Sequence, residues 1–225
     1  MTTTNQTTPT LNTHAIESFF ASITDSEREF QTEYWNSIAP ANDSECFQRF
    51  LFAYCSVHTT WESNIKAYQL IKNWWEWINQ WDELENRIKQ SGAGLFRNRV
   101  RFIKDFSTKF WTNPCFYTKQ GEDESWSGFR NRIEKTILGL GMAKSSFSIE
   151  MMYPTIGQVF CSDTHMFQLY GLNQTKHSKQ YQDIERHWVR MSFEYEIAPY
   201  IARCIFWDRK QNQENSRYWS YVLEK

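Results

Sequence analysis

Two short stretches decide how this 225-residue sequence is expected to fold: GLGMAKSSF at residues 139–147 and CSDTHMFQLYG at residues 161–171. The first places two glycines after an apolar run and before a segment with helical character, which is typical of a tight turn between two helices. Backbone amides that open the second helix can hold a phosphate without reading sequence. In the second stretch, Asp163 directly precedes a short helical pattern, as residues that cap helices do.

Apolar residues recur at helical spacing on both sides of these stretches. The chain shows no β-alternation long enough for a sheet and no internal repeat, so the expected fold class is all-α. We expect a disordered lead over residues 1–13 and one domain over 14–225. The expected helices cover residues 44–57, 61–81, 94–111, 121–138, 179–209 and 214–223.

The composition excludes several classes of protein. The five cysteines are scattered and form no CxxC pair, which favours reduced thiols in a cytoplasmic protein and leaves no zinc ribbon or iron–sulfur motif. We therefore expect no cofactor and no metal. No apolar run approaches the roughly 20 residues that span a bilayer, and residues 1–13 lack the features of a signal peptide.

Charge is distributed unevenly along a chain whose formal net charge is −1. Residues 87–144 hold twelve lysines and arginines against five acidic residues. Such a stretch is compatible with contacts to the phosphates of double-stranded DNA, with Arg97 and Arg99 as candidates. The alternative interpretation is a solvated helix face.

Four segments together resemble the HhH-GPD superfamily of DNA glycosylases. LGLGMAKSSF (138–147) is similar to the family hairpin LPGVGxKxA, and CSDTHMFQLYG (161–171) is similar to the VDxH segment that follows it. Upstream, residues 52–71 resemble the family's early helix pair and residues 94–106 resemble the segment GLYxxKAxxI. The resemblance covers roughly residues 45–172. It implies a helix-hairpin-helix DNA glycosylase fold of two helical lobes with the active site in the cleft between them, the hairpin at 130–153 and the catalytic aspartate segment at 161–172.

The resemblance also implies roles for individual residues. Asp163 would stabilise the positive charge that develops on the sugar, or activate the attacking water or amine, and capping of a helix is compatible with either role. His165 would lie near the phosphate of the flipped nucleotide, and His58 would fill the gap that the flipped base leaves. The phosphate grip falls on the hairpin positions Gly139, Gly141, Ala143 and Ser145. Candidate rings for the base pocket are Phe147, Trp61 and Trp207.

The sequence departs from the family pattern at three points. Leu138 stands where the family usually has proline, and only Cys204 follows Asp163, which points to the branches without an iron–sulfur cluster. The register of the family's lysine falls on Ala143, whereas Lys144 is one residue further along. Lys144 is therefore either a nucleophile that adds lyase activity or a phosphate contact of a monofunctional enzyme.

The expected function is excision of a damaged or modified base from DNA by a monomeric enzyme. The base is 8-oxoguanine or a bulky phage-type base such as glucosylated hydroxymethylcytosine, the latter in antiviral defence. Two other classes remain open: a non-catalytic helix-hairpin-helix DNA-binding module, which would need no carboxylate at Asp163, and a helical interaction protein that does not bind DNA.

Overall fold

A computed structural model describes residues 11–57 and 60–211, and within these ranges every regular element is a helix. This confirms the all-α fold class. None of the helices within these ranges could cross a bilayer, given their length and polarity. The α-helices are α1 (Thr13–Ala21), α2 (Asp25–Ser37), α3 (Asp43–Cys55), α4 (Trp61–Ile71), α5 (Trp81–Gln90), α6 (Phe96–Thr112), α7 (Pro114–Thr118), α8 (Trp126–Thr136), α9 (Met142–Met152), α10 (Thr164–Leu169), α11 (Tyr181–Glu194) and α12 (Pro199–Gln211), with 3₁₀ turns η1 (Trp74–Glu76) and η2 (Ser178–Gln180).

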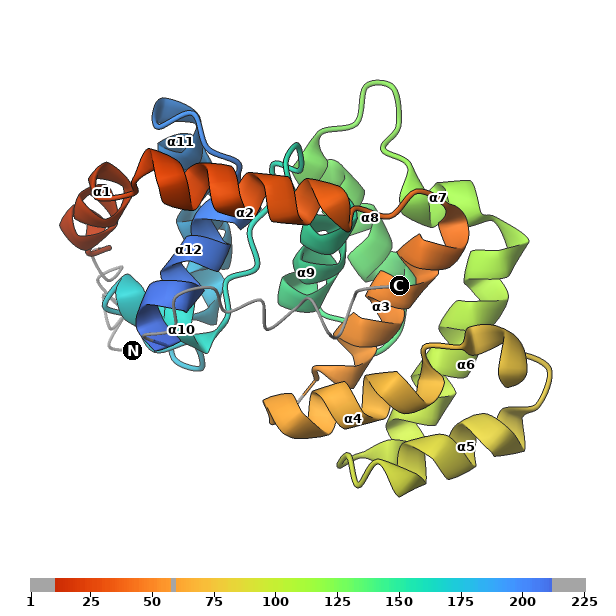
Figure 1. Ribbon diagram of the computed structural model, residues 1–225. Helices are drawn as coiled ribbons and strands as arrows, with labels where there is room; N and C mark the ends of the chain where they lie inside the picture. The colour runs from red at the N-terminus through yellow and green to blue at the C-terminus, as the bar shows by residue number, and fades with distance from the viewer. Residues whose placement is uncertain (1–10, 58–59, 212–225) are drawn as a thin grey trace, which may run out of the picture.

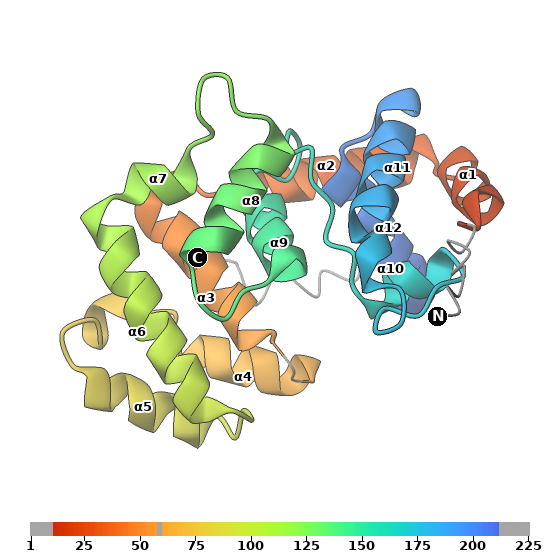
Figure 2. The same cartoon turned by 180° about the vertical axis from the view of Figure 1, so that it is seen from behind.

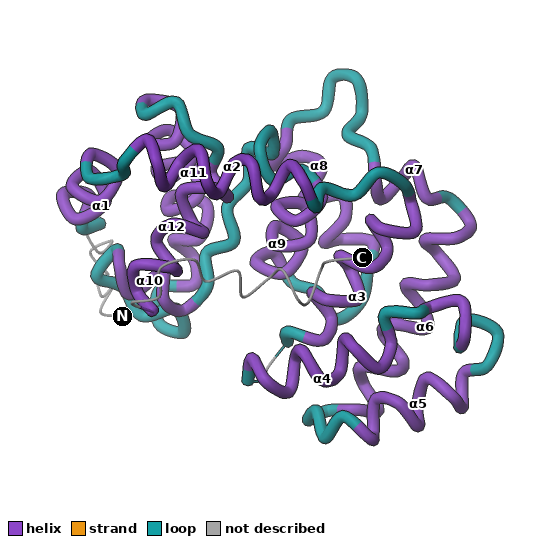
Figure 3. Tube along the Cα trace, in the orientation of Figure 1, coloured by secondary structure: helices purple, strands orange, loops and turns teal. Residues whose placement is uncertain are grey.

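The helices form two lobes. Helices α3 to α9 make up one lobe, and α1, α10, α11 and α12 make up the other, as Figures 1 and 2 show from opposite sides. Helix α2 runs between them: it packs along α12, and its far end reaches the hairpin lobe. Between α9 and α10 the chain crosses from one lobe to the other through the extended segment 153–163, drawn as a loop in Figure 3. The hairpin and Asp163 thus belong to different lobes.

Aromatic side chains fill the core of the lobe that carries the hairpin. Helix α3 is buried along most of its length and packs on α4, α6 and α9. Its Phe47 ring stacks on Phe106 of α6 with ring centroids 5.6 Å apart. Packed rings of this kind add roughly 0.5–1.5 kcal/mol beyond their buried area. Much of the aromatic content of the sequence therefore builds the core.

Rings also hold the second lobe together and join α2 to it. Trp188 of α11 stacks on Phe160 of the linker segment, with ring centroids 4.5 Å apart. Trp35 of α2 is fully buried and its ring meets Tyr200 of α12 at 4.6 Å. The contact of Phe160 with Trp188 fastens the linker segment three residues before Asp163.

Two expected helices are broken in the structure. The expected helix over 61–81 ends at Ile71, because the buried indole of Trp77 donates to the Ile71 carbonyl oxygen (2.8 Å) and the chain turns back so that α5 packs on α4. The expected helix over 179–209 is divided at residues 195–198, where Glu196 adopts φ 50° and Pro199 starts a new helix. The segment 214–223 lies outside the described residues.

The expected disordered lead of residues 1–13 extends too far. The Asn12 side chain caps α1 by accepting a hydrogen bond from the backbone amide of Ala15. The backbone amide of Asn12 donates to the Tyr170 carbonyl oxygen at 3.1 Å. Ordered packing therefore begins by residue 11, and residues 1–10 lie outside the described chain.

Candidate active site

The hairpin turns at Gly139 for a steric reason. Gly139 has φ +84°, and a Cβ atom there would lie 2.2 Å from the ring of Phe102 on α6. Only glycine combines this backbone conformation with that approach. Tyr54 of α3 donates to the Leu138 carbonyl oxygen (2.9 Å), which ties the turn to the centre of the lobe. The Tyr54 hydrogen bond and the close approach to Phe102 therefore hold the turn in place.

The first turn of α9 presents backbone to solvent. Gly141 is exposed and caps the helix without any side-chain hydrogen bond. Met142 and Ala143 follow it at the positive end of the helix dipole, which favours an anion. Of the residues expected to hold a phosphate, Gly139 and Gly141 are thus exposed and Ala143 is half-buried.

Ser145 does not fit the expected role in DNA binding. Its amide donates to the Gly141 carbonyl oxygen (2.9 Å) within the helix, and the residue is fully buried. Because each residue of a helix points in a different direction from the one before it, Ser145 faces the core although Lys144 is half-buried. The phosphate-binding face therefore ends before Ser145.

Lys144 and Phe147 lie together on α9, one turn apart. The Lys144 ammonium lies 5.3 Å from the centroid of the Phe147 ring, and the lysine is half-buried. Phe147 is 4% exposed, so it is not the open stacking platform for a base that the sequence suggested. Its ring instead lies beneath two cations, Lys144 and Arg203 of α12 (5.2 Å).

Asp163 caps α10 and keeps one oxygen free of hydrogen bonds to the helix. Its Oδ1 accepts from the amides of His165 (2.9 Å) and Met166 (3.1 Å). Its Oδ2 lies 3.9 Å from Nη1 of Arg203, and the side chain is 27% exposed. The capping role therefore uses one oxygen of the carboxylate, and the other faces Arg203.

Arg203 connects Asp163 to the opposite lobe through Glu150. Its Nη2 and Nε donate to Glu150 on α9 at 2.5 Å and 3.1 Å, and both side chains are almost fully buried. Glu150 also accepts from the Cys161 amide at 2.9 Å. Burial raises the pKa of Glu150 to about 7, with Asp163 adding to the rise while Arg203 and the Cys161 amide oppose it.

Sequence reasoning missed this pair, although a weak signal was present. Glu150 stands in the apolar run SIEMM and Arg203 in the apolar run YIARCIF. A single charge within an apolar helix is rarely buried unless it is paired. The signal indicates that each residue needs a partner, but it does not say which one.

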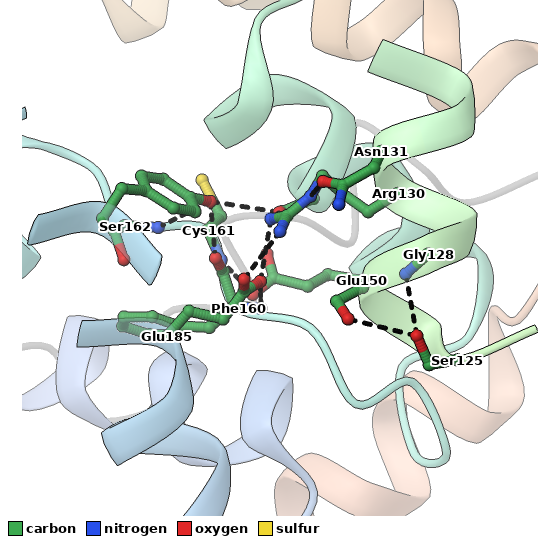
Figure 4. A network of polar contacts seen from close by, with 12 residues as sticks. Ser125, Gly128, Arg130, Asn131, Glu150, Phe160, Cys161, Ser162 and Glu185 are labelled. Carbon is green, nitrogen blue, oxygen red and sulfur yellow. Dashed lines mark hydrogen bonds and ion pairs between the residues drawn. The ribbon is translucent and has the colours of Figure 1, made fainter. Parts of the chain in front are cut away.

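A second buried pair joins the lobes close by, and Figure 4 shows its polar network. Arg130 of α8 binds Glu185 of α11 through two hydrogen bonds of 2.9 and 2.8 Å. Glu185 also accepts from the Phe160 amide at 3.2 Å. The linker segment is thus fastened at Phe160 and Cys161 by carboxylates from both lobes.

His165, Trp207 and Lys210 form a partly exposed cluster beyond Asp163. The Lys210 ammonium lies 2.7 Å from Nδ1 of His165, and the Trp207 ring meets the His165 ring edge-on at 4.9 Å. Lys210 was not among the residues expected from the sequence.

The two arginines expected to bind DNA differ. Arg97 is exposed at the start of α6. Arg99 is 3% exposed, and its guanidinium donates to the carbonyl oxygens of Tyr54, Cys55 (3.1 Å) and Val57 at the end of α3. The prediction that Arg99 contacts DNA is therefore wrong, because its guanidinium N–H groups bind the carbonyl oxygens at the end of α3.

Two further expectations fall outside what the structure describes. His58 lies in the segment 58–59, outside the described residues. Trp61 begins α4, but its side chain is not described. Their expected roles stay predictions.

Comparisons with known proteins agree on the fold. No family model matches the sequence, and no curated protein matches it. Among solved structures, the 8-oxoguanine DNA glycosylase of Thermotoga maritima has a TM-score of 0.68 at 14% identity, covering 87% of this chain and 95% of that one. The 8-oxoguanine DNA glycosylase of Methanocaldococcus jannaschii has a TM-score of 0.68 at 18% identity, covering 89% and 94%.

The M. jannaschii 8-oxoguanine glycosylase/lyase in complex with a 15mer DNA containing 8-oxoguanine has a TM-score of 0.69 at 18% identity, covering 89% of this chain and 97% of that one. The structural similarity covers 94–97% of each of these chains and 87–89% of this one, so it includes both lobes. The chain has the helical fold of these 8-oxoguanine DNA glycosylase structures.

Proposed function

We propose that this protein is a DNA glycosylase that flips a modified base out of double-stranded DNA and cleaves its N-glycosidic bond. The observation that carries the proposal is Asp163: within this fold, its partly exposed carboxylate follows the segment that leaves the hairpin lobe, and one of its oxygens is free of helix capping. Oxidised guanine is the first candidate substrate, because three solved structures with this fold are 8-oxoguanine glycosylases.

Each lobe has its own task in the proposed reaction. The exposed amides at the start of α9 bind a backbone phosphate and set the position of the duplex. Breaking the glycosidic bond builds positive charge on the sugar, and the Asp163 carboxylate stabilises that charge. Because one chain supplies both parts, we expect the protein to act as a monomer.

Lys144 decides between two mechanisms. In the first, the Lys144 amine attacks C1′, and the base leaves with the bonding electrons and takes up a proton. The C1′–O4′ bond then opens to give a Schiff base, and elimination of the 3′ phosphate cleaves the strand. With Lys144 as a phosphate contact, water attacks C1′ and leaves an intact abasic strand. Lys144 is half-buried in the first turn of α9, next to the backbone amides proposed to bind phosphate, so its position fits both mechanisms and borohydride trapping decides between them.

The test is base release from a panel of duplexes with and without alkali. The panel contains 8-oxoguanine, uracil, alkylated purines and glucosylated hydroxymethylcytosine, the last to test a role in defence against phage. We expect Asp163→Asn to lower base release by about 10²–10³-fold while DNA affinity stays within a few-fold of wild type. Full activity in Asp163→Asn would contradict the assignment, and DNA binding without base release from any substrate would favour the binding module.

Borohydride trapping tests Lys144 directly. A covalent protein–DNA adduct that is lost in Lys144→Gln and kept in Lys135→Gln would identify the amine. Lys135 is the matched control because it is an exposed lysine on the other helix of the hairpin. Strand breaks that appear only after alkali, with no adduct, would assign Lys144 to phosphate binding.

A further inference from the structure

Arg203 lies between two carboxylates that come from different parts of the fold. On one side it binds Glu150 of α9 at 2.5 Å, and on the other its Nη1 lies 3.9 Å from Oδ2 of Asp163. Arg203 is 4% exposed and Glu150 is fully buried, whereas Asp163 is 27% exposed. The three groups therefore run from the interior of the protein to its surface.

The guanidinium of Arg203 cannot turn away from this position. Glu150 accepts two of its hydrogen bonds and is itself fixed by the Cys161 amide. The rings of Phe147 and Tyr200 each have the guanidinium within 5.2 Å of their centroids. The flexible arginine side chain is thus immobilised before any ligand binds.

The Asp163 oxygen that faces the Arg203 guanidinium is Oδ2, the one that does not cap α10. The two helix amides hold Oδ1, and the distance of 3.9 Å from Oδ2 to Arg203 is longer than a hydrogen bond. The contact is electrostatic, so Oδ2 keeps its lone pairs for another partner. The guanidinium attracts Oδ2 and so holds the carboxylate in one orientation.

We propose that Arg203 is a positioning residue for base excision: held in place by Glu150, it fixes the orientation of the Asp163 carboxylate through Oδ2. Glu150 has a second task in this arrangement. A lone Arg203–Asp163 pair would be neutral and would give little stabilisation to a positive sugar, whereas the triad with an ionised Glu150 carries a net negative charge. This inference rests on the proposed glycosylase function.

The charges around the triad come from every element that packs on it. Burial raises the pKa of the Cys161 thiol to about 12 and that of the Tyr200 hydroxyl well above its usual range, so both stay neutral. Burial likewise raises the pKa of the Cys204 thiol, which interacts with Arg203 and Glu150. Further charged or titratable neighbours include Arg49 on α3, Lys144 on α9, His165 on α10, and Asp208 and Lys210 on α12.

The experiment compares three variants over pH 5–9 in single-turnover base release. In the double variant Glu150→Leu/Arg203→Met, we expect the rate at pH 8 to fall at least tenfold while DNA affinity stays within a few-fold of wild type, because the guanidinium that orients Asp163 is gone. In Glu150→Gln, we expect the rate at pH 8 to fall about tenfold, with a smaller loss at pH 6, where Glu150 of the wild type is already protonated. The matched control Arg130→Met/Glu185→Leu removes the other buried pair and should keep the wild-type profile.

A second readout needs no activity. In DNA-free protein labelled with ¹³C-aspartate, the Asp163 carboxyl resonance at pH 8 should move in the double variant and keep its wild-type position in Arg130→Met/Glu185→Leu. An unmoved resonance in the double variant would overturn the role of Arg203, even in an active enzyme. Base release that is absent from the wild type would defeat the proposed function, while a moved resonance would still establish the contact between Arg203 and Asp163.

Discussion

Two buried arginine–glutamate pairs cross between the lobes, and they differ in what the arginine faces on its other side. Arg130 is bound by Glu185, and it also donates to the neutral groups of Ser146 (3.0 Å) and Asn131 (2.8 Å). Arg203 is bound by Glu150 and faces the carboxylate of Asp163.

The comparison separates two uses of the same chemistry. Replacing a buried pair by apolar residues of similar size is often neutral for stability, so neither pair is needed for its energy alone. The Arg130 pair fastens the linker segment to both lobes. The Arg203 pair does the same and also places a positive charge beside the candidate catalytic carboxylate.

Breaking either pair halfway should have the largest effect. Arg130→Met and Arg203→Met each leave a buried glutamate without its partner, and we expect each to lower the free energy of unfolding by about 3–5 kcal/mol. Urea denaturation measures this. Removal of both partners should restore most of the stability in each case, and a double variant as unstable as its single variant would show that the pairs carry net binding energy.

The two glycines of the hairpin give a second internal comparison of similar residues in different surroundings. Gly139→Ala forces a side chain into a positive-φ position against Phe102, and we expect a loss of about 1–3 kcal/mol in the free energy of unfolding. Gly141→Ala meets open space and should cost less than about 1 kcal/mol. Equal losses in thermal unfolding would mean that the Phe102 contact relaxes freely.

The pH dependence of stability sharpens the comparison of the two pairs. A carboxyl whose pKa is raised by folding to about 7 binds a proton in the folded state between roughly pH 4.5 and 7 that the unfolded state has released. The contribution of Glu150 to stability therefore decreases as pH rises through this range, by about 1 kcal/mol between pH 6 and 8. Denaturation at both pH values should show this decrease in wild type and in Glu185→Gln, but not in Glu150→Gln.

The smallest effect is expected for Lys210, an exposed cation that lies beside His165. Lys210→Ala removes one charge beside His165 at the surface, and we expect DNA affinity to fall a few-fold. The slope of log affinity against log salt should decrease by about one. Asp183, an exposed acid on α11, offers a control: its substitution by asparagine should not weaken binding. An unchanged salt slope in Lys210→Ala would place Lys210 away from the DNA.

Local features of the site were predictable from sequence, and features that depend on burial were not. The turn at Gly139 and the helix cap at Asp163 follow from residues within a few positions of each other, and the structure has both. Arg97 and Arg99 look alike in the sequence, yet one is exposed and the other caps α3 from within. A pattern of charges on one helix does not reveal which of them meets a carbonyl group from another.

The sequence by itself determined the all-α class, the hairpin and the order in which hairpin and aspartate follow each other. These depend on helical periodicity, capping and glycine conformation, which act over about one turn of chain. Only the tertiary structure decided that Glu150 and Arg203, 53 residues apart, are partners and that Arg203 faces Asp163. Burial and charge pairing depend on neighbours brought together from distant parts of the chain, and no local pattern encodes them.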